Sequence, residues 1–155
     1  MKKKILIIGS AGYIGPVLIN HLKQKLDLSK YQILGVDTNW FSKNLEINGY
    51  NSYLPEIMYN YDCRNFNLKN LNINPTVIIF LAAISNDPMG NRFKKATNEI
   101  NTKSCINLAK QAKAIGAKKF IFASSCSIYG ASGNASRKEN DPIQPLTDYA
   151  VSKVK

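Results

Sequence analysis

The junction between a short apolar run and a glycine-rich turn, close to the first residue, constrains the fold more than any other feature of the sequence. Lys4–Ile8 carries four consecutive Ile and Leu residues and predicts a strand that is buried on both faces. Gly9, Gly12 and Gly15 follow this run directly. The apolar residues that then recur at helical spacing are Ile14, Val17, Leu18, Leu22 and Leu26. The sequence therefore predicts a strand, a tight turn and a helix in immediate succession.

The same alternation of short apolar runs and longer helical patterns continues along the chain. Further strands are predicted at Gln32–Asp37, Met58–Tyr61, Val77–Leu81 and Lys119–Ser124. A long helix over roughly residues 92–115 is expected to end at Gly116, because glycine is a common signal for a helix C-terminus. Strands separated by helices of this length predict an α/β fold with a doubly wound parallel sheet of the Rossmann type.

The connections are less regular. Residues 38–57 have no clear period and are predicted to be mostly loop, and Ser85–Pro88 is predicted to form a loop after the fourth strand. Thr147 or Asp148 is expected to cap a last helix. Since no internal repeat or domain boundary interrupts the pattern, we expect residues 1–155 to form one domain.

The glycine turn has the context of a dinucleotide-binding fingerprint, because it follows a strand and opens a helix. Its spacing is GxxGxxG rather than GxGxxG, but the physical demands are similar: a tight turn and a close approach of the backbone to a pyrophosphate. The N-terminus of the helix also offers free N–H groups to the phosphates. An ordinary glycine turn would show the same spacing, so the loop alone does not decide. The residues predicted to contact the cofactor here are Gly9, Gly12, Tyr13, Ile14 and Gly15.

An acidic residue strengthens this interpretation. Asp37 ends the second predicted strand, about twenty residues beyond the loop, where a carboxylate accepts hydrogen bonds from the ribose hydroxyls of a dinucleotide. It would also repel a 2′-phosphate, so NAD is favoured over NADP. The alternative is that Asp37 only caps a turn.

A second group of polar residues lies near the end of the sequence. Tyr149 and Lys153 are four residues apart and share a face of the predicted helix. A neighbouring ammonium favours the phenolate form of a tyrosine, and a serine hydroxyl can orient a substrate oxygen. Ser124 and Ser125 end the fifth predicted strand, at the edge of the sheet where open α/β folds bind ligands. Taken alone, a Tyr and a Lys at this spacing are more often found on a solvated helix face.

Read together, the motifs resemble the extended short-chain dehydrogenase/reductase family, the group of NAD-dependent sugar epimerases and dehydratases. The resemblance covers the chain from Lys4 to its last residues. The residues that carry it are Gly9, Gly12, Gly15, Asp37, Asp62, Leu81, Ala82, Ala83, Asn101, Ser125, Tyr129, Gly130, Tyr149 and Lys153.

The resemblance implies a role for most of these residues. It implies Ser125, Tyr149 and Lys153 as the catalytic triad, with Lys153 also holding the nicotinamide ribose. It implies that the backbone of Leu81–Ala83 lies along NAD, that Asn101 supports the site from the long helix, and that Asp62 faces the adenine. A turn role for Asp62, and a purely local hydrogen bond for Asn101, are the alternatives.

The resemblance also bears on the reaction. The 4,6-dehydratases of this family carry acidic residues just after the catalytic Ser or Thr, whereas this sequence has Cys126 and Ser127 there. An epimerase or a reductase acting on a nucleotide-sugar is therefore expected, and a homodimer is usual in the family. Family members run to roughly twice this length and add a substrate-binding lobe, so we expect residues 1–155 to be an incomplete NAD-binding domain. A non-catalytic or truncated NAD-binding domain is the alternative function.

Composition excludes other classes. The net charge of +11 arises from scattered lysines in a chain that is also rich in Asn and Ile, so nucleic-acid binding is not expected. Three widely spaced cysteines without a CxxC pair favour reduced thiols in a cytoplasmic protein over a disulfide framework or a metal site. The first apolar run is too short for a signal peptide, and no segment approaches the length of a membrane span.

Overall fold

The computed structural model describes residues 2–40, 50–131 and 136–154. The chain forms two compact units, each made of two stretches of sequence. The first comprises Met1–Ala82 and Cys105–Ala123, and the second comprises Ala83–Ser104 and Ser124–Lys155.

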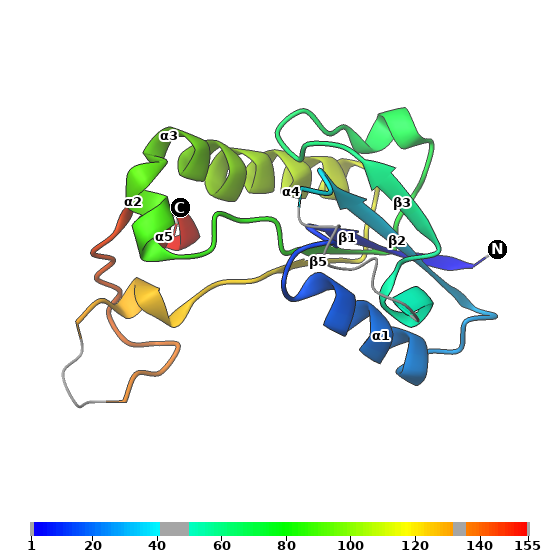
Figure 1. Ribbon diagram of the computed structural model, residues 1–155, viewed down its shortest axis with the longest axis horizontal. Coiled ribbons are helices and arrows are strands. Elements are labelled where there is room, and N and C mark those ends of the chain that lie inside the picture. Colours follow the sequence, from blue (N-terminus) through cyan, green and yellow to red (C-terminus); the bar gives the residue numbers. More distant parts are fainter. Residues whose placement is uncertain (1, 41–49, 132–135, 155) are drawn as a thin grey trace. The chain divides into compact units, whose positions relative to one another are not determined.

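A five-stranded parallel sheet forms the centre of the first unit (Figure 1). The strands are β1 (Lys3–Ile8), β2 (Tyr31–Asp37), β3 (Ile57–Asn60), β4 (Val77–Phe80) and β5 (Lys119–Phe122). Their order is β3-β2-β1-β4-β5, so the chain leaves the central strand β1 first to one side and then to the other. Every neighbouring pair is parallel. This arrangement confirms the predicted doubly wound sheet of the Rossmann type.

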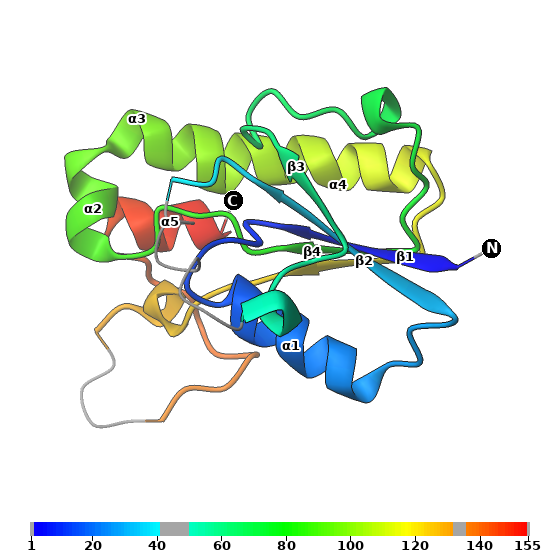
Figure 2. The same cartoon turned by 45° about the vertical axis from the view of Figure 1, so that its right-hand side comes forward.

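Helices cover both faces of the sheet. Figures 1 and 2 show α1 (Gly15–Lys25) on one face and α4 (Cys105–Ala114) on the opposite one. Because side chains alternate along a strand, β1 contributes side chains to the apolar core on each face of the sheet. The core that includes part of α1 consists of Ile5, Ile7, Ile19, Ile33 and Ile79. The residues between them on the strands, such as Leu6 and Ile8, are fully buried as well. Burial on both faces explains why these strands read as continuous apolar runs.

The carboxyl ends of the strands meet at one edge of the sheet, and the predicted cofactor residues of this unit lie there. Gly9 follows β1, Asp37 ends β2, Asp62 lies just beyond β3 and Leu81 follows β4. The register is set by pairs such as Ile8 with Val36 and Ile8 with Phe80. In an open α/β sheet this edge is where ligands bind.

The second unit consists of short helices. They are α2 (Asp87–Arg92), α3 (Lys94–Thr97), a π-helix (Asn98–Ser104), a 3-10 turn (Cys126–Tyr129) and α5 (Asp148–Val154). Asn86 caps α2, since its Oδ1 accepts a hydrogen bond from the N–H of Met89. The last helix, α5, packs against α2, α3, the π-helix and the 3-10 turn.

The observed boundaries correct several predictions. The helix expected over residues 92–115 is not uniform: Arg92 ends α2, and α3, the π-helix and α4 then follow one another up to Ala114. The loop expected at Ser85–Pro88 already contains the start of α2 at Asp87. Four strands differ from their predicted ranges at one end only, by one or two residues, and β3 is shifted by one residue at both ends.

Other connections fit the sequence more closely. The irregular segment at 38–57 contains a 3-10 turn at Tyr50–Tyr53 and the first residue of β3, and its residues 41–49 lie outside the described part. Gly116 has a φ of 74°, and its N–H bonds to the carbonyl of Lys113, as expected for a glycine that ends a helix. The expectation of one domain over residues 1–155 stays a prediction.

Candidate functional site

Two of the three glycines in the loop are required by the packing of the chain itself. Gly9 has a φ of 86°, and a Cβ atom on it would lie 2.5 Å from the backbone nitrogen of Ala82. A Cβ atom on Gly15, the first residue of α1, would overlap the backbone of Ser10. Both positions therefore need glycine so that the backbone can turn and pack tightly.

Gly12 differs from these two. The nearest atom to a Cβ built on it is the carbonyl oxygen of Gly9, at 3.4 Å, so the folded chain leaves room for a small side chain there. The two residues that follow point outward: Tyr13 is 99% exposed and Ile14 is 56% exposed. Between Gly9 and Gly15, Gly12 is therefore the half-buried position at which the backbone has no side chain and has room for a small group.

The N-terminus of α1 has the properties of an anion site. Ile14 occupies the cap position without a side-chain cap, and the first turn carries no acidic residue. Among the hydrogen bonds of the described residues, none uses the backbone N–H of Tyr13, Ile14 or Gly15. Pro16 falls in the first turn, where its missing N–H is not needed. Free N–H groups at the positive end of a helix dipole favour a phosphate.

Asp37 links the end of β2 to the glycine loop. Its Oδ2 accepts a hydrogen bond of 2.9 Å from the N–H of Ala11, and its Oδ1 accepts one of 3.0 Å from the N–H of Asn39. The carboxylate therefore has a turn role as well. Since a carboxylate has about four acceptor positions, two remain for ribose hydroxyls.

The backbone after β4 lies against the glycine loop. The N–H groups of Leu81 and Ala82 both donate to the carbonyl of Ile8, at 2.8 and 2.9 Å. Together with the contact between Gly9 and Ala82, this places Leu81 and Ala82 at the same edge as the loop. Ala83, the third residue of the predicted set, is the first residue of the second unit.

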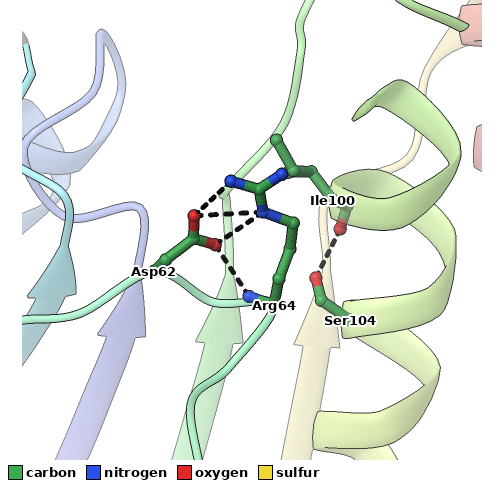
Figure 3. A network of polar contacts seen from close by, with 4 residues as sticks. All are labelled: Asp62, Arg64, Ile100 and Ser104. Atoms are coloured by element: carbon green, nitrogen blue, oxygen red, sulfur yellow. Dashed lines mark hydrogen bonds and ion pairs between the residues drawn. The ribbon is translucent and has the colours of Figure 1, made fainter. Parts of the chain in front are cut away.

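Asp62 forms a tight local pair with Arg64 in the first unit (Figure 3). Its carboxylate accepts from the backbone N–H of Arg64 and from the Nε and Nη2 atoms of its guanidinium. The hydrogen bond from the Arg64 side chain holds the pKa of Asp62 below its ordinary value. The turn role is therefore present, and an adenine contact stays a prediction.

In the second unit, α5 carries Tyr149 and Lys153. The Nζ atom of Lys153 lies 5.7 Å from the centre of the Tyr149 ring, so the two side chains share a face of the helix. Lys153 is only 8% exposed, which is unusual for a lysine. Thr147 caps the helix, because its Oγ1 accepts from the N–H of Ala150 at 3.1 Å.

Ser125 precedes the 3-10 turn that packs against α5. Its Oγ accepts from the N–H of Ser127 at 3.2 Å and lies 3.1 Å from the Ser127 hydroxyl. The side chain is thus fixed as the cap of this turn. Ser125, Tyr149 and Lys153 belong to the same unit, as the catalytic prediction requires.

Asn101 lies in the π-helix and is 1% exposed. Its Oδ1 accepts from the N–H of Ile84 at 2.9 Å, and its Nδ2 donates to the Ile84 carbonyl and to the Ser152 hydroxyl, both at 3.0 Å. These partners are distant in sequence, so the alternative of a purely local hydrogen bond is wrong.

Some residues of this unit were not anticipated from the sequence. Ser152 and Thr102 are buried and hydrogen-bonded to each other across the π-helix and α5. A Cβ atom on Gly90 would lie 2.9 Å from the Cβ of Tyr149, so this glycine allows α2 and α5 to approach closely. A glycine inside a helix is the one signal in the sequence for such a contact.

The donor set of the first unit fits a dinucleotide. The unpaired N–H groups at α1, the space at Gly12 and the remaining acceptor positions of Asp37 match a pyrophosphate and a ribose in that order. Within the described ranges, no cluster of three or more His, Cys, Asp or Glu residues is arranged to hold a metal ion. No helix in the described part of the chain is both long and apolar enough to cross a membrane.

Comparison with known proteins identifies a family whose description names NAD. A sequence model of the family described as "NAD dependent epimerase/dehydratase" matches residues 5–155. A UDP-glucose epimerase of Bacillus subtilis, itself uncharacterised, is 31% identical over 97% of this chain and 48% of its own length. The UDP-glucose 4-epimerase of Vibrio cholerae is 31% identical over 99% of this chain and 44% of its own length. The chain thus spans about half the length of the curated relatives it matches.

Solved structures share the fold. The UDP-N-acetylglucosamine 4-epimerase from Methanobrevibacter ruminantium, in complex with UDP-N-acetylmuramic acid, has a TM-score of 0.81 at 23% identity and covers 99% of this chain and 48% of its own. The UDP-glucose 4-epimerase from Bifidobacterium longum, with NAD+ and UDP, has a TM-score of 0.81 at 23% identity over 98% of this chain and 46% of its own. An NAD-dependent NDP-hexosamine 5,6-dehydratase has a TM-score of 0.79 at 22% identity over 99% of this chain and 47% of its own. Likeness at this identity establishes the fold, which epimerases and a dehydratase share.

Proposed function

Because the chain belongs to the NAD-dependent epimerase/dehydratase family, we propose that it carries the NAD site and the acid–base residues of a nucleotide-sugar epimerase or a related oxidoreductase. The observation that carries the proposal is the buried Lys153 with its ammonium beside the Tyr149 ring. Burying a lysine is costly unless its charge is used, and a tyrosine that exchanges protons needs such a neighbour.

The first unit would hold the cofactor. The N–H groups at the start of α1 would bind the pyrophosphate, which Gly12 lets approach the backbone, while Gly9 and Gly15 allow the loop itself to turn and pack tightly. Asp37 accepts hydrogen bonds from the adenosine ribose and disfavours a 2′-phosphate, which selects NAD over NADP. Asp62, Leu81 and Ala82 of this unit would complete its contacts with NAD, and Ala83 and Lys153 are the residues of the second unit that we propose to contact NAD, Lys153 at the nicotinamide ribose.

The second unit would supply the acid–base chemistry. Tyr149 removes the proton from a sugar hydroxyl as that carbon is oxidised, and gives it back when the ketosugar is reduced. The Lys153 ammonium stabilises the negative charge that develops on the tyrosine oxygen, and the Ser125 hydroxyl holds the reacting oxygen. Bound NAD would supply the acceptor and donor of the hydride at the sugar carbon.

An epimerase is favoured over a 4,6-dehydratase by the residues after Ser125. Elimination of water from a ketosugar needs a group that gives a proton to the leaving hydroxyl. Cys126 and Ser127 occupy the positions where such acids are expected, and neither side chain is an acid at neutral pH. A ketosugar that cannot eliminate water can turn over and accept the hydride on its other face.

The test is turnover of a panel of UDP-hexoses by the purified protein with NAD, followed by chromatographic separation of the epimers. We expect interconversion by the wild-type protein and a loss of at least about a hundred-fold in Tyr149→Phe, since general acid–base catalysis contributes about 10²–10⁴-fold. Tyr31→Phe, in β2 of the first unit and outside the predicted site, is the matched control and should keep its activity. Full activity of Tyr149→Phe would contradict the proposal. NAD binding without any turnover of the panel would overturn the catalytic part in favour of a non-catalytic NAD-binding domain.

A further inference from the structure

The helix that carries Tyr149 and Lys153 is joined to neighbouring elements by hydrogen bonds of its own residues and of Thr147, which caps it. These hydrogen bonds help to fix where the tyrosine oxygen and the lysine ammonium lie. The inference below rests on the proposed function, because it concerns the same two residues.

The first turn of α5 is tied to α2 and α3. The Thr147 hydroxyl donates to Asp87 at 2.5 Å, and Asp148 pairs with Lys94 at 3.0 Å. The glycine at position 90 lets the α2 backbone approach Tyr149. The ion pair is exposed and contributes little, so the Thr147 contacts hold most of this end.

The turn of α5 that precedes Lys153 is joined to the π-helix by hydrogen bonds of Ser152. Its hydroxyl donates to the carbonyl of Tyr149 at 2.6 Å and accepts from the Nδ2 of Asn101 at 3.0 Å. Its own carbonyl accepts from the Thr102 hydroxyl at 3.3 Å. All three tying residues are buried, with exposures of 5% for Ser152, 1% for Asn101 and 7% for Thr102.

Asn101 is in turn fixed by backbone groups. Both polar atoms of its amide bond to Ile84, so the second Nδ2 hydrogen is left for Ser152 and the amide has no freedom to rotate. Two successive residues, 101 and 102, reach the same serine. Both residues lie in the π-helix, and π-helical segments are frequent at functional sites.

The hydrogen bond from Ser152 to Tyr149 could be mistaken for an ordinary local contact. A serine inside a helix often donates to a carbonyl three or four residues before it. Ser104 does so in the π-helix, where its hydroxyl donates to the Ile100 carbonyl (Figure 3). Ser152 makes such a local bond and also accepts a buried hydrogen bond from Asn101, a residue 51 positions away.

We propose that Ser152 is a positioning residue, which joins the Asn101 amide to the backbone of Tyr149 and thereby fixes the Tyr149–Lys153 pair. It acts through these two residues and touches neither substrate nor cofactor. Removing its hydroxyl leaves one hydrogen of a fully buried amide without an acceptor and releases the last turn of α5.

The test uses the whole 155-residue chain in two measurements, one of which does not depend on activity. The first is hydrogen exchange by mass spectrometry, with acylation of Lys153 by acetic anhydride followed on the same peptides. In Ser152→Ala we expect the rate of hydrogen exchange over residues 148–154 and the rate of Lys153 acylation each to rise about five- to ten-fold. This factor corresponds to the loss of one buried hydrogen bond. Ser104→Ala is the matched control, and its exchange over residues 148–154 should stay at the wild-type rate. Ser152→Thr keeps the hydroxyl and should restore slow exchange.

The second measurement is a split between kcat and KM. Ser152→Ala should lower kcat about ten-fold with the KM for the nucleotide-sugar within about two-fold of wild type, since the acid–base pair is loosened while no substrate contact is removed. In the double variant, Asn101→Ala should lower kcat little beyond the loss caused by Ser152→Ala alone, because both substitutions break the same hydrogen bond.

The outcomes separate this inference from the proposed function. Unchanged exchange and acylation over residues 148–154 in Ser152→Ala would overturn the positioning role, whether or not the protein is active. If the wild-type protein turns over no nucleotide-sugar, the proposed function fails. The exchange result then still supports or overturns the role of Ser152 in holding α5.

Discussion

Glycines that look equivalent in the sequence do different things in the loop before α1. Gly9 and Gly15 are needed because backbone atoms of Ala82 and Ser10 occupy the space of a side chain. Gly12 has no such neighbour, and the nearest atom to its missing Cβ is at an ordinary contact distance. The spacing in the sequence predicts a glycine at all three positions. The structure shows that two of them are needed for folding and leaves the third free for a role in binding.

This contrast gives a prediction for Gly12→Ala. The folded chain has room for the methyl group, so the midpoint of thermal unfolding should stay within about 2 °C of wild type. The same methyl group fills the space where a pyrophosphate would meet the backbone, so the Kd for NAD should rise at least about ten-fold, or about 1.4 kcal/mol. Calorimetric titration and a melting curve measure both quantities.

Gly15→Ala serves as the comparison variant. Its methyl group would collide with the Ser10 backbone, so this variant should lose stability, by a few kcal/mol. If Gly12→Ala bound NAD as tightly as wild type, the loop would be an ordinary glycine turn.

The Asp62–Arg64 pair predicts a dependence of stability on pH. The pKa of Asp62 is lowered in the folded chain from its ordinary value of 3.8, mainly by the hydrogen bond from Arg64. The ionised carboxylate therefore stabilises the fold, fully so above that value, and the contribution is lost as pH falls through the folded pKa. Asp62→Asn should lower the free energy of unfolding at pH 7 by less than about 1 kcal/mol, because the pair is partly exposed.

Urea unfolding from pH 7 down to pH 2 measures this effect. The difference between wild type and Asp62→Asn should shrink towards zero in acid, and high salt should reduce it at pH 7. A difference that stays constant over the whole pH range would show that the charge of Asp62 has no part in it.

At the scale of elements, the sequence predicts what depends on local pattern. The strands were predictable because apolar runs such as Ile5–Ile8 are buried on both faces of a parallel sheet. Gly116 marked the end of α4 because its positive φ suits glycine.

Other elements depend on contacts between distant residues, and these the sequence did not reveal. The helix α2 contains both a proline and a glycine, which are poor helix formers, and it is held by the Asn86 cap and by its contact with α5. The π-helix has i→i+5 hydrogen bonds and a wider turn than an α-helix, but its seven residues are too few to show a separate period in the sequence. A pattern of period 3.6 therefore predicts one long helix where the chain has three segments.

The candidate site divides in the same way. The positions of Gly9, Gly12, Gly15 and Asp37 at the carboxyl ends of β1 and β2 were predictable, because the glycines stand between an apolar run and a helical pattern and Asp37 ends the next apolar run. Ser152 was not, since its importance comes from Asn101, 51 residues away. A serine beside Lys153 gives no signal of its own.

At the scale of the whole molecule, the predicted functions fall in different compact units. The cofactor loop and Asp37 belong to the unit built on the parallel sheet, and Ser125, Tyr149 and Lys153 belong to the helical unit. The chain covers about half of the length of its epimerase relatives. NAD binding is accordingly the part of the proposed function that depends least on the rest of such a protein.

The most direct test of the account is therefore a calorimetric titration of the 155-residue chain with NAD and with NADP. We expect NAD to bind and NADP to bind at least about ten-fold more weakly, because a carboxylate at position 37 accepts from a ribose hydroxyl and repels a phosphate. In Asp37→Asn, which keeps an acceptor for the Ala11 N–H, the difference between the two cofactors should become small. An absence of NAD binding, or equal affinity of the wild-type chain for NADP, would contradict the account.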